Sequence, residues 1–209
     1  AVADVLFGKI TPSGKLTTTF PRSVGQLPLF YNHLNTGRPD PDSRMFNRYA
    51  SNYLDESNEP LYPFGYGLSY TDFVYGELQI SSETLPKNGE LTVSVTVTNK
   101  GNYDGYETVQ LYLRDIYAEV ARPMKELKGF ERIFLKSGES RDVKFVITKD
   151  DLKFYNSELH YVYEPGEFDV MVGPNSRDVQ LKVSKQNKVT PDKSCIVGST
   201  YYNRTSLHS

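Results

Sequence analysis

The stretch LTVSVTVT, residues 91–98, alternates strictly between apolar and polar side chains. Leu91, Val93, Val95 and Val97 fall on one side of an extended chain, and the threonines and the serine fall on the other. Successive side chains of a strand point to opposite faces, so this pattern predicts a strand with one buried face. We expect Val95 to point into a core.

The alternation recurs three times further along the chain. Apolar residues occupy every second position in 109–113, 143–147 and 168–172, and turn-forming residues stand between these runs. Weaker strand patterns occur at 73–80, 126–135, 159–163 and 179–183. Seven or eight short strands at this spacing, with no helical pattern between them, predict an all-β protein built as an antiparallel sandwich. A parallel α/β fold is excluded because its strands need crossover helices.

Within this class, the sequence favours a fibronectin type III-like (immunoglobulin-like) β-sandwich. The chain of 209 residues holds one cysteine, Cys195, and no tryptophan. An intrachain disulfide and a core Trp, which mark antibody-type domains, are therefore both excluded. We place the sandwich at residues 64–184.

Residues 1–28 have a different character. The opening AVADVLFG predicts the last turns of a helix, with Gly8 in the left-handed conformation that commonly ends one. Lys15 to Phe20 is β-branched and predicts a short strand. One helix end and one strand cannot bury their apolar sides against each other. We therefore expect these residues to be the last elements of an α/β sandwich domain, which would make the chain a piece of a larger protein.

Residues 29–63 predict an extended connecting segment. They contain several prolines and many Asn, Ser and Asp residues, without helical or strand periodicity. Large apolar side chains such as Phe30, Tyr31 and Tyr62 would be costly to leave in water, so the segment should lie against a surface. Residues 185–209 are polar and aperiodic, and we expect them to be disordered.

Composition excludes several classes of function. The net charge is −2, from 24 Lys and Arg against 26 Asp and Glu, so nothing suggests a nucleic-acid or anionic-membrane partner. No apolar run approaches the roughly 20 residues of a membrane helix. The three histidines lie far apart and lack metal-ligand spacing. The 16 Tyr and 11 Phe suit a β core, and a sugar-stacking surface is the alternative.

An ordered series of motifs resembles glycoside hydrolase family 3, the β-glucosidases and β-xylosidases, over about residues 1–184. Before the sandwich these motifs are PSGKL (12–16), TFP (19–21), VGQLP (24–28), YNH (31–33), RY (48–49), YLD (53–55) and PLYPFGYGLSYT (60–71). Within the sandwich they are VTVTN (95–99), DG (104–105), VQLY (109–112), RP (122–123), KELKGF (125–130) and EPG (164–166).

The resemblance implies a parent enzyme with a (β/α)8-type barrel, an α/β sandwich and a terminal fibronectin type III-like domain. Its partners would be these upstream domains and a β-linked glucoside or oligosaccharide, with no cofactor and a periplasmic or secreted location. The implied reaction is retaining hydrolysis of terminal non-reducing β-D-glucosyl residues, which needs two carboxyl groups about 5 Å apart. In the family both lie upstream of the region matched here, and no position of this chain matches either motif. We expect the isolated chain to be inactive, and its oligomeric state stays open.

The connecting segment carries the candidate site residues. Arg48, Tyr49, Tyr53 and Asp55, with Arg44 beside them, could reach the rim of the substrate site and contact a distal sugar. The alternative is that these side chains pin the segment to the scaffold.

Other polar residues permit simpler interpretations. Asp55 and Glu164 could be paired as a catalytic dyad, but we interpret both as solvated or capping carboxylates. His33 is expected to form hydrogen bonds within the segment. Arg122 stands in a long loop, where docking on a neighbouring domain and a solvated charge are equally open.

The rival hypothesis is a carbohydrate-binding or cell-surface adhesion module. Such a module needs two or three coplanar aromatic rings on the solvent side of one sheet. Tyr112 is an outward candidate, but no clear row accompanies it. The same alternation predicts that Thr96 and Gln110 also point outward, away from the core.

Overall fold

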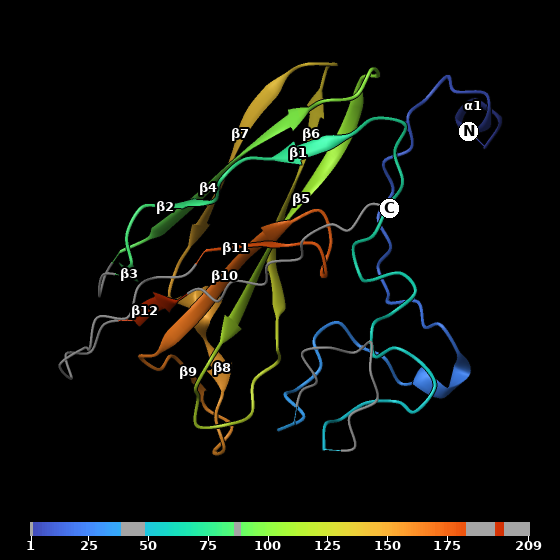
Figure 1. Ribbon diagram of the computed structural model, residues 1–209. Coiled ribbons are helices and arrows are strands. Elements are labelled where there is room, and N and C mark those ends of the chain that lie inside the picture. The colour runs from blue at the N-terminus through green and yellow to red at the C-terminus, as the bar shows by residue number, and fades with distance from the viewer. Residues whose placement is uncertain (1, 39–48, 86–88, 183–194, 199–209) are drawn as a thin grey trace.

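The computed structural model describes residues 2–38, 49–85, 89–182 and 195–198. Most of these residues form a β-sandwich, and the segment before β1 (Phe73–Tyr75) runs along one side of it (Figure 1). The expected fold, an all-β fibronectin type III-like sandwich, is confirmed. The described residues contain no helix long and apolar enough to cross a membrane.

The first sheet is centred on β4 (Leu91–Asn99), the strand predicted from the alternating stretch. Its antiparallel partner β7 (Ser140–Ile147) pairs along eight positions, from Leu91 with Ile147 to Thr98 with Ser140. On the other side of β4 lie β1 and β2 (Gln79–Ile80). The predicted strand at 73–80 is thus split in two, with Gly76 between the halves.

The second sheet has β5 (Gly105–Asp115) and β10 (Glu167–Gly173) side by side in antiparallel register. The edge strand β6 (Glu126–Leu135) pairs with the other side of β5, with a bulge between Leu111 and Tyr112. Beyond β10 lie β11 (Gln180–Lys182), β12 (Cys195–Gly198) and β3 (Thr84–Leu85). A small hairpin of β8 (Phe154–Tyr155) and β9 (Tyr161–Val162) follows the short helix η2 (Asp150–Leu152).

The core lies between the two sheets and is built from the alternating residues. Val95 is 2% exposed and Leu111 is 3% exposed, as predicted. Their neighbours in the cluster are almost all Val, Leu and Ile, joined by Phe168 of β10. Burying one such side chain contributes about 1.5–3 kcal/mol, so this cluster is the main source of stability.

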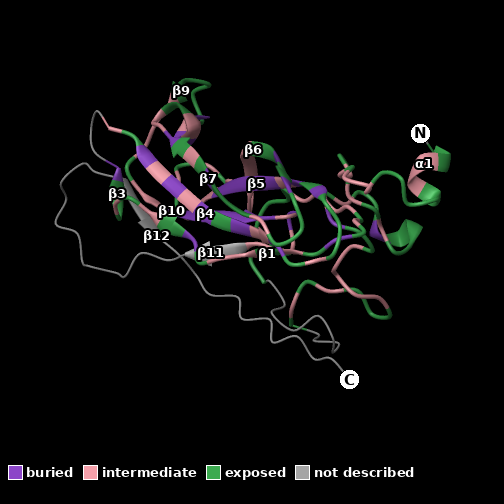
Figure 2. Cartoon of the chain, turned by 90° about the horizontal axis from the view of Figure 1, so that it is seen from above, coloured by how far each residue is buried: buried purple, intermediate pink, exposed green. Residues whose placement is uncertain are grey.

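Two strands, β5 and β10, are unusual because their outward faces are buried as well. Figure 2 shows β5 in purple along most of its length. Gln110 and Tyr112 point away from the core, yet they are 3% and 0% exposed. The expectation that both would face solvent is wrong, because the connecting segment covers this face.

The amino-terminal part agrees in one element and differs in another. Helix α1 (Val2–Leu6) is followed by Gly8 at φ 72°, as expected. Residues 15–20, in contrast, form no strand. Within this range only Phe20 forms a β-bridge, to Tyr62. The backbone of residues 15–20 bonds to residues 62–66 at separate points and not as a continuous ladder.

The tail is described at four residues. Residues Cys195–Gly198 form β12, which runs parallel to β10 and antiparallel to β3. Two apolar β-branched residues in a row, Ile196 and Val197, favour such a strand. The expectation of disorder for the tail stays a prediction. The rest of 185–209 lies outside the described residues.

Candidate inter-domain docking site

The amino-terminal segment is fixed to the end of the connecting segment by backbone hydrogen bonds. The amide of Leu16 donates to the carbonyl of Tyr66 (2.7 Å), and the amide of Gly65 donates to the carbonyl of Leu16 (2.8 Å). Four residues on, the amide of Phe20 donates to the carbonyl of Tyr62 (2.9 Å). These bonds join residues 16–20 and 62–66 into one unit that lies on the sandwich.

Aromatic rings attach this unit to β5. The ring of Tyr31 stacks on Phe64 with centroids 4.2 Å apart and meets Tyr112 edge-on at 6.0 Å. Burial, followed by the neighbouring Tyr31, raises the pKa of Tyr112, so its hydroxyl stays protonated and acts as a donor. Aromatic pairs of this kind add about 0.5–1.5 kcal/mol beyond their area.

Gln110 is the polar centre of the same contact. Its Nε2 donates to the carbonyl oxygens of Gly65 (3.3 Å) and Pro174 (2.7 Å), and its Oε1 accepts from the hydroxyl of Tyr112 (2.5 Å). Gly65 has φ 78°, and a Cβ there would lie 2.1 Å from Gln110 Oε1. The position therefore accepts only glycine without rearrangement.

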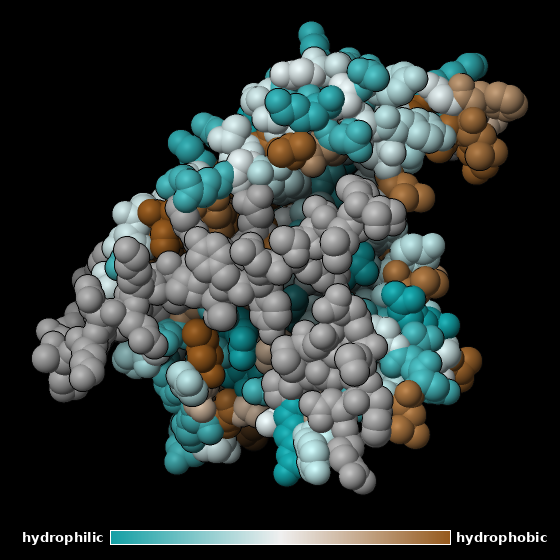
Figure 3. All heavy atoms as spheres, in the orientation of Figure 1, coloured by the Kyte–Doolittle hydropathy of each residue, from teal (hydrophilic) through white to brown (hydrophobic). Residues whose placement is uncertain are grey.

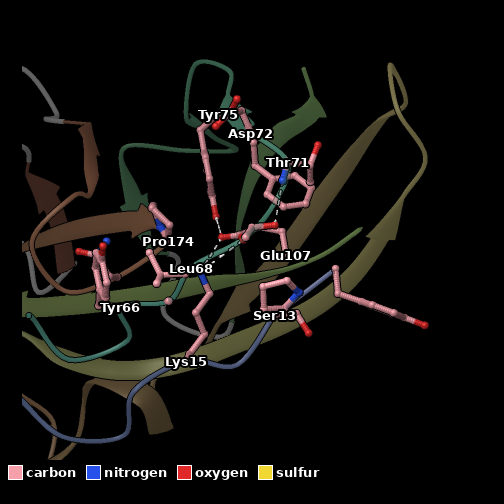
Figure 4. A pocket seen from close by; sticks show the side chains of 15 residues that line it. Ser13, Lys15, Tyr66, Leu68, Thr71, Asp72, Tyr75, Glu107 and Pro174 are labelled. Carbon is pink, nitrogen blue, oxygen red and sulfur yellow. Dashed lines mark hydrogen bonds and ion pairs between the residues drawn. The ribbon is translucent and has the colours of Figure 1, made fainter. Parts of the chain in front are cut away.

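A charged contact secures the other end of the unit (Figure 4). Nζ of Lys15 lies 3.1 and 3.3 Å from the two carboxylate oxygens of Glu107, whose side chain is 6% exposed. The hydroxyl of Tyr75, from β1, donates to Oε1 of Glu107 (2.9 Å). Burial, and then the Glu107 charge and hydrogen bond, raise the pKa of Tyr75, which keeps this donor protonated.

These three side chains come from three parts of the chain. Glu107 follows the core-facing register of Val109 and Leu111, so its carboxylate closes the space between the sheets at one end of the sandwich. Lys15 arrives from the amino-terminal segment and Tyr75 from the first sheet. Beside them opens a hollow of about 240 Å³, with Ser69 and Asp72 in its wall.

A buried amide holds the 21–28 stretch in the same way. Gln26, in the short helix η1 (Val24–Gln26), is 1% exposed. Its Oε1 accepts from the amide of Arg22 (2.6 Å), and its Nε2 donates to the carbonyl of Ser57 (2.6 Å). Gln26 thereby links the 21–28 stretch to the connecting segment at Ser57.

The predicted rim residues lie on the exposed side of the connecting segment. Tyr49 is 72% exposed, Tyr53 is 38% exposed and Asp55 is exposed. Arg48 and Arg44 lie outside the described residues. The exposure leaves the rim hypothesis for Tyr49, Tyr53 and Asp55 as a prediction, and it argues against a purely internal anchoring role.

The supposed dyad is not brought together by any described contact. Glu164, half-buried before β10, accepts a hydrogen bond from the amide of Glu119 (3.2 Å). In the described part of the chain, no hydrogen bond or ion pair joins it to Asp55.

His33 joins the connecting segment to the loop before β6, whereas Arg122 contacts residues of the sandwich. His33 Nδ1 lies 2.9 Å from the carbonyl of Leu34, and the His33 carbonyl accepts from the amide of Met124 (2.9 Å). Arg122 donates to Glu126 (2.7 Å) and lies over the ring of Phe154 at 4.6 Å. Its side chain is 15% exposed, so the solvated alternative is wrong.

A buried carboxylate, that of Asp115, lies at the end of β5 near this loop. Burial raises the pKa of Asp115 to about 6, although Arg122 and the Tyr117 amide oppose the shift. Oδ1 of Asp115 has no hydrogen-bond partner among the described residues. Within the same part of the chain, no group of three or more His, Cys, Asp and Glu residues is arranged to hold a metal ion.

The amino-terminal end carries an apolar surface. Figure 3 shows apolar side chains gathered around α1. Val2, Leu6 and Phe7 are 75%, 73% and 83% exposed, and α1 buries none of its residues. A surface of this kind marks a contact with another domain or protein.

The aromatic residues at the candidate positions do not provide the coplanar row that the rival hypothesis requires. Tyr112 is buried, as described above. On the outer side of β5 and β6, Tyr106 and Phe134 are 4.9 Å apart but tilted by 57°, and Arg132 covers the Tyr106 ring at 3.6 Å. These two rings are not coplanar and do not offer a flat platform for a sugar.

Comparison with known families assigns both halves of this contact. Residues 1–70 match the model of the glycosyl hydrolase family 3 C-terminal domain, and residues 107–176 match that of the fibronectin type III-like domain. The chain belongs to glycoside hydrolase family 3. It corresponds to the carboxyl-terminal part of these enzymes, as the motifs suggested.

Individual family-3 proteins are similar over most of the chain. The periplasmic β-glucosidase of Salmonella typhimurium is 52% identical over 180 residues, covering 86% of this chain and 23% of its own length. A putative β-xylosidase of Formosa agariphila is 44% identical over 188 residues, with 90% and 23% covered. This family-3 chain thus spans about a quarter of the length of these curated relatives.

A solved structure gives the same result. The crystal structure of a β-glucosidase from Listeria innocua in complex with glucose superposes with a TM-score of 0.80 at 44% identity. The superposed region covers 94% of this chain and 26% of the Listeria chain. The contacts of Lys15 with Glu107 and of Gly65 with Gln110 each join a residue matched by one family model to a residue matched by the other.

The sequence interpretation missed Lys15, Glu107 and Gln110. A signal was present for one of them, because Glu107 is charged yet stands in the apolar register of β5. A carboxylate at such a position requires a buried partner. No local pattern identifies Lys15 as that partner, since 92 residues separate the two.

Proposed function

We propose that this chain is the structural, non-catalytic end of a β-glucosidase that hydrolyses terminal non-reducing β-D-glucosyl residues with retention. Its role is to hold the last part of the catalytic α/β domain and the connecting segment in place. A periplasmic or secreted location belongs to the same proposal. The names of the Salmonella and Listeria relatives support the β-glucosidase activity, and the Salmonella name supports the periplasmic location.

The observation that carries the structural role is the burial of both faces of β5. A lone sandwich would leave Gln110 and Tyr112 in water, whereas here Tyr31, Phe64 and Gly65 cover them. The exposed Tyr49, Tyr53 and Asp55 are proposed, with Arg48, to approach the substrate rim from the segment held in this way.

The requirements of the reaction favour a structural role over catalysis by the chain itself. Retaining hydrolysis needs two carboxyl groups placed on either side of the scissile bond. The carboxylates considered, Asp55 and Glu164, have different environments, and no described contact relates them.

The test exchanges this chain with the matching end of the Salmonella β-glucosidase. Deletion of that end should abolish hydrolysis of an aryl β-D-glucoside, and fusion of this chain should restore at least a tenth of it. This chain alone should give no turnover. Full activity of the deleted relative, or turnover by this chain that Asp55→Asn or Glu164→Gln removes, would refute the proposal.

The rim hypothesis is tested in the same chimaera. Tyr49→Ala and Tyr53→Ala should raise KM for a cellodextrin more than KM for an aryl glucoside, since a distal sugar would be the missing contact. Tyr103→Ala, at another exposed tyrosine, is the control. Equal effects on both substrates would contradict a rim role.

A further inference from the structure

The carboxylate of Glu107 stands at an unusual position for a charge. Its neighbours in register along β5 are core residues, and its side chain is 6% exposed. A buried carboxylate is strongly unfavourable unless opposite charge and hydrogen bonds compensate it. Here the compensation comes from outside the sandwich core, through Nζ of Lys15 at 3.1 and 3.3 Å.

The path of the Lys15 side chain is closely shaped. A Cβ added at Gly67 would lie 2.9 Å from Cδ of Lys15 and 2.4 Å from the carbonyl oxygen of Gly14. The hydroxyl of Tyr75 approaches Glu107 from the opposite side, as Figure 4 shows. The close approach of Gly67 therefore constrains the path of the lysine stem toward a carboxylate that Tyr75 already holds.

The hollow of about 240 Å³ gives this acceptor access to solvent. Lys15, Tyr75 and Glu107 all line it, together with Ser69 and Asp72. A small cation could therefore reach Glu107 if the lysine side chain were absent.

We propose that Glu107, Tyr75 and the adjoining hollow form a binding site for a primary ammonium group. Lys15 occupies the site in cis, and this occupation fastens the amino-terminal segment to the sandwich. A free alkylammonium ion is the ligand class that the emptied site takes. The inference concerns the docking contact and is independent of the parent enzyme's activity.

The test uses the full chain with Lys15→Ala and n-propylammonium chloride, which supplies the three carbons and the nitrogen that the substitution removes. The substitution should lower Tm by about 5–10 °C, because Glu107 loses its counter-charge. Propylammonium at millimolar concentration should restore at least half of this loss in a saturable way. Amide exchange at Leu16, whose N–H bonds to Tyr66, should slow in parallel.

Four controls define the outcome. Equal ionic strength of sodium chloride and equal 1-propanol should have no such effect on Lys15→Ala. Lys144→Ala, at an exposed lysine of β7, should not respond to the amine. Lys15→Ala combined with Glu107→Gln should not respond either. An equal rise of Tm in any of these would overturn the proposal.

A second pair of variants applies if Lys15→Ala does not fold. Lys15→Met keeps the stem and removes the charge, and Glu107→Gln then removes the uncompensated carboxylate. The double variant should be more stable than Lys15→Met alone. Additive losses in Tm would refute a specific ammonium–carboxylate contact.

Discussion

The hydroxyl of Tyr112 donates a hydrogen bond to Oε1 of Gln110, 2.5 Å away, on the outward face of β5. Both side chains are buried there under the connecting segment. A polar pair on the outer face of a sheet normally faces water, where its hydrogen bonds contribute little. Covered in this way, the pair becomes part of the interior and each of its bonds must be satisfied.

The first prediction concerns this pair. Gln110→Ala should lower the free energy of unfolding by about 1–3 kcal/mol, because Tyr112 and two carbonyl groups lose their partner. Thr108→Ala, also outward on β5 but only half-buried, is the control and should cost about 0.5 kcal/mol. Urea unfolding followed by tyrosine fluorescence measures both. Equal losses would show that the covering segment does not protect Gln110.

The second prediction concerns the core between the sheets. Val95→Ala and Leu111→Ala should each cost roughly 1–5 kcal/mol, with the larger value for Leu111, because they remove buried methyl groups and leave a cavity. Thr96→Ala, on the exposed side of β4, should change stability by only about 0.5 kcal/mol. If Thr96→Ala were the most damaging of the three, the register of β4 would be inverted.

The third prediction separates backbone strain from packing at glycine. Gly65 and Gly138 both have φ 78°, but an added Cβ meets Gln110 at Gly65 and nothing within 4 Å at Gly138. Alanine at Gly138 should cost about 1 kcal/mol for the left-handed backbone. Alanine at Gly65 should cost at least about 1 kcal/mol more. Thermal unfolding of the two variants compares them, and equal shifts in Tm would mean that Gln110 moves aside freely.

The fourth prediction is a pH dependence. Burial raises the folded-state pKa of Asp115 to about 6, against 3.8 for an ordinary aspartate carboxyl. The unfolded state therefore loses this proton at lower pH, and the stability contributed by the protonated carboxyl is lost as pH rises from about 4 to 6. Between pH 4 and 7 the loss should reach about 1–3 kcal/mol.

Asp115→Asn removes this titration, so its free energy of unfolding should fall less over the same range. Chemical denaturation at four pH values between 4 and 7 provides the comparison. Asp55→Asn, at an exposed carboxylate, should keep the wild-type slope. A slope for Asp115→Asn as steep as that of the wild type would assign the pH dependence elsewhere.

The strands were predictable where one face meets a uniform apolar core. In β4 the period of two is unbroken over eight residues, and the structure places the strand at Leu91–Asn99. The weaker pattern at 126–135 also matches β6 (Glu126–Leu135). At 15–20, β-branched composition alone suggested a strand, but no neighbouring strand offers a continuous ladder there.

The docking site was less predictable because it depends on distant parts of the chain. Polarity correctly placed Gln110 on the outer face of β5. It could not show that Tyr31 and Gly65 cover that face from 79 and 45 positions away. Lys15 likewise has no local feature that distinguishes it from a solvated lysine, and only its contact with Glu107 reveals its role.

The contact between Lys15 and Glu107 also bears on how such a domain is inherited. A gene fusion that transferred only the sandwich, starting near Phe64, would leave the buried carboxylate of Glu107 without its counter-charge. It would also expose Tyr112, because Tyr31 would be missing. A transferable module must therefore include the upstream strip from about Thr11 to Leu34, which supplies both the cation and the ring of Tyr31. The unit that can be transferred intact is longer than the sandwich, and fusion points that preserve its stability should fall before this strip.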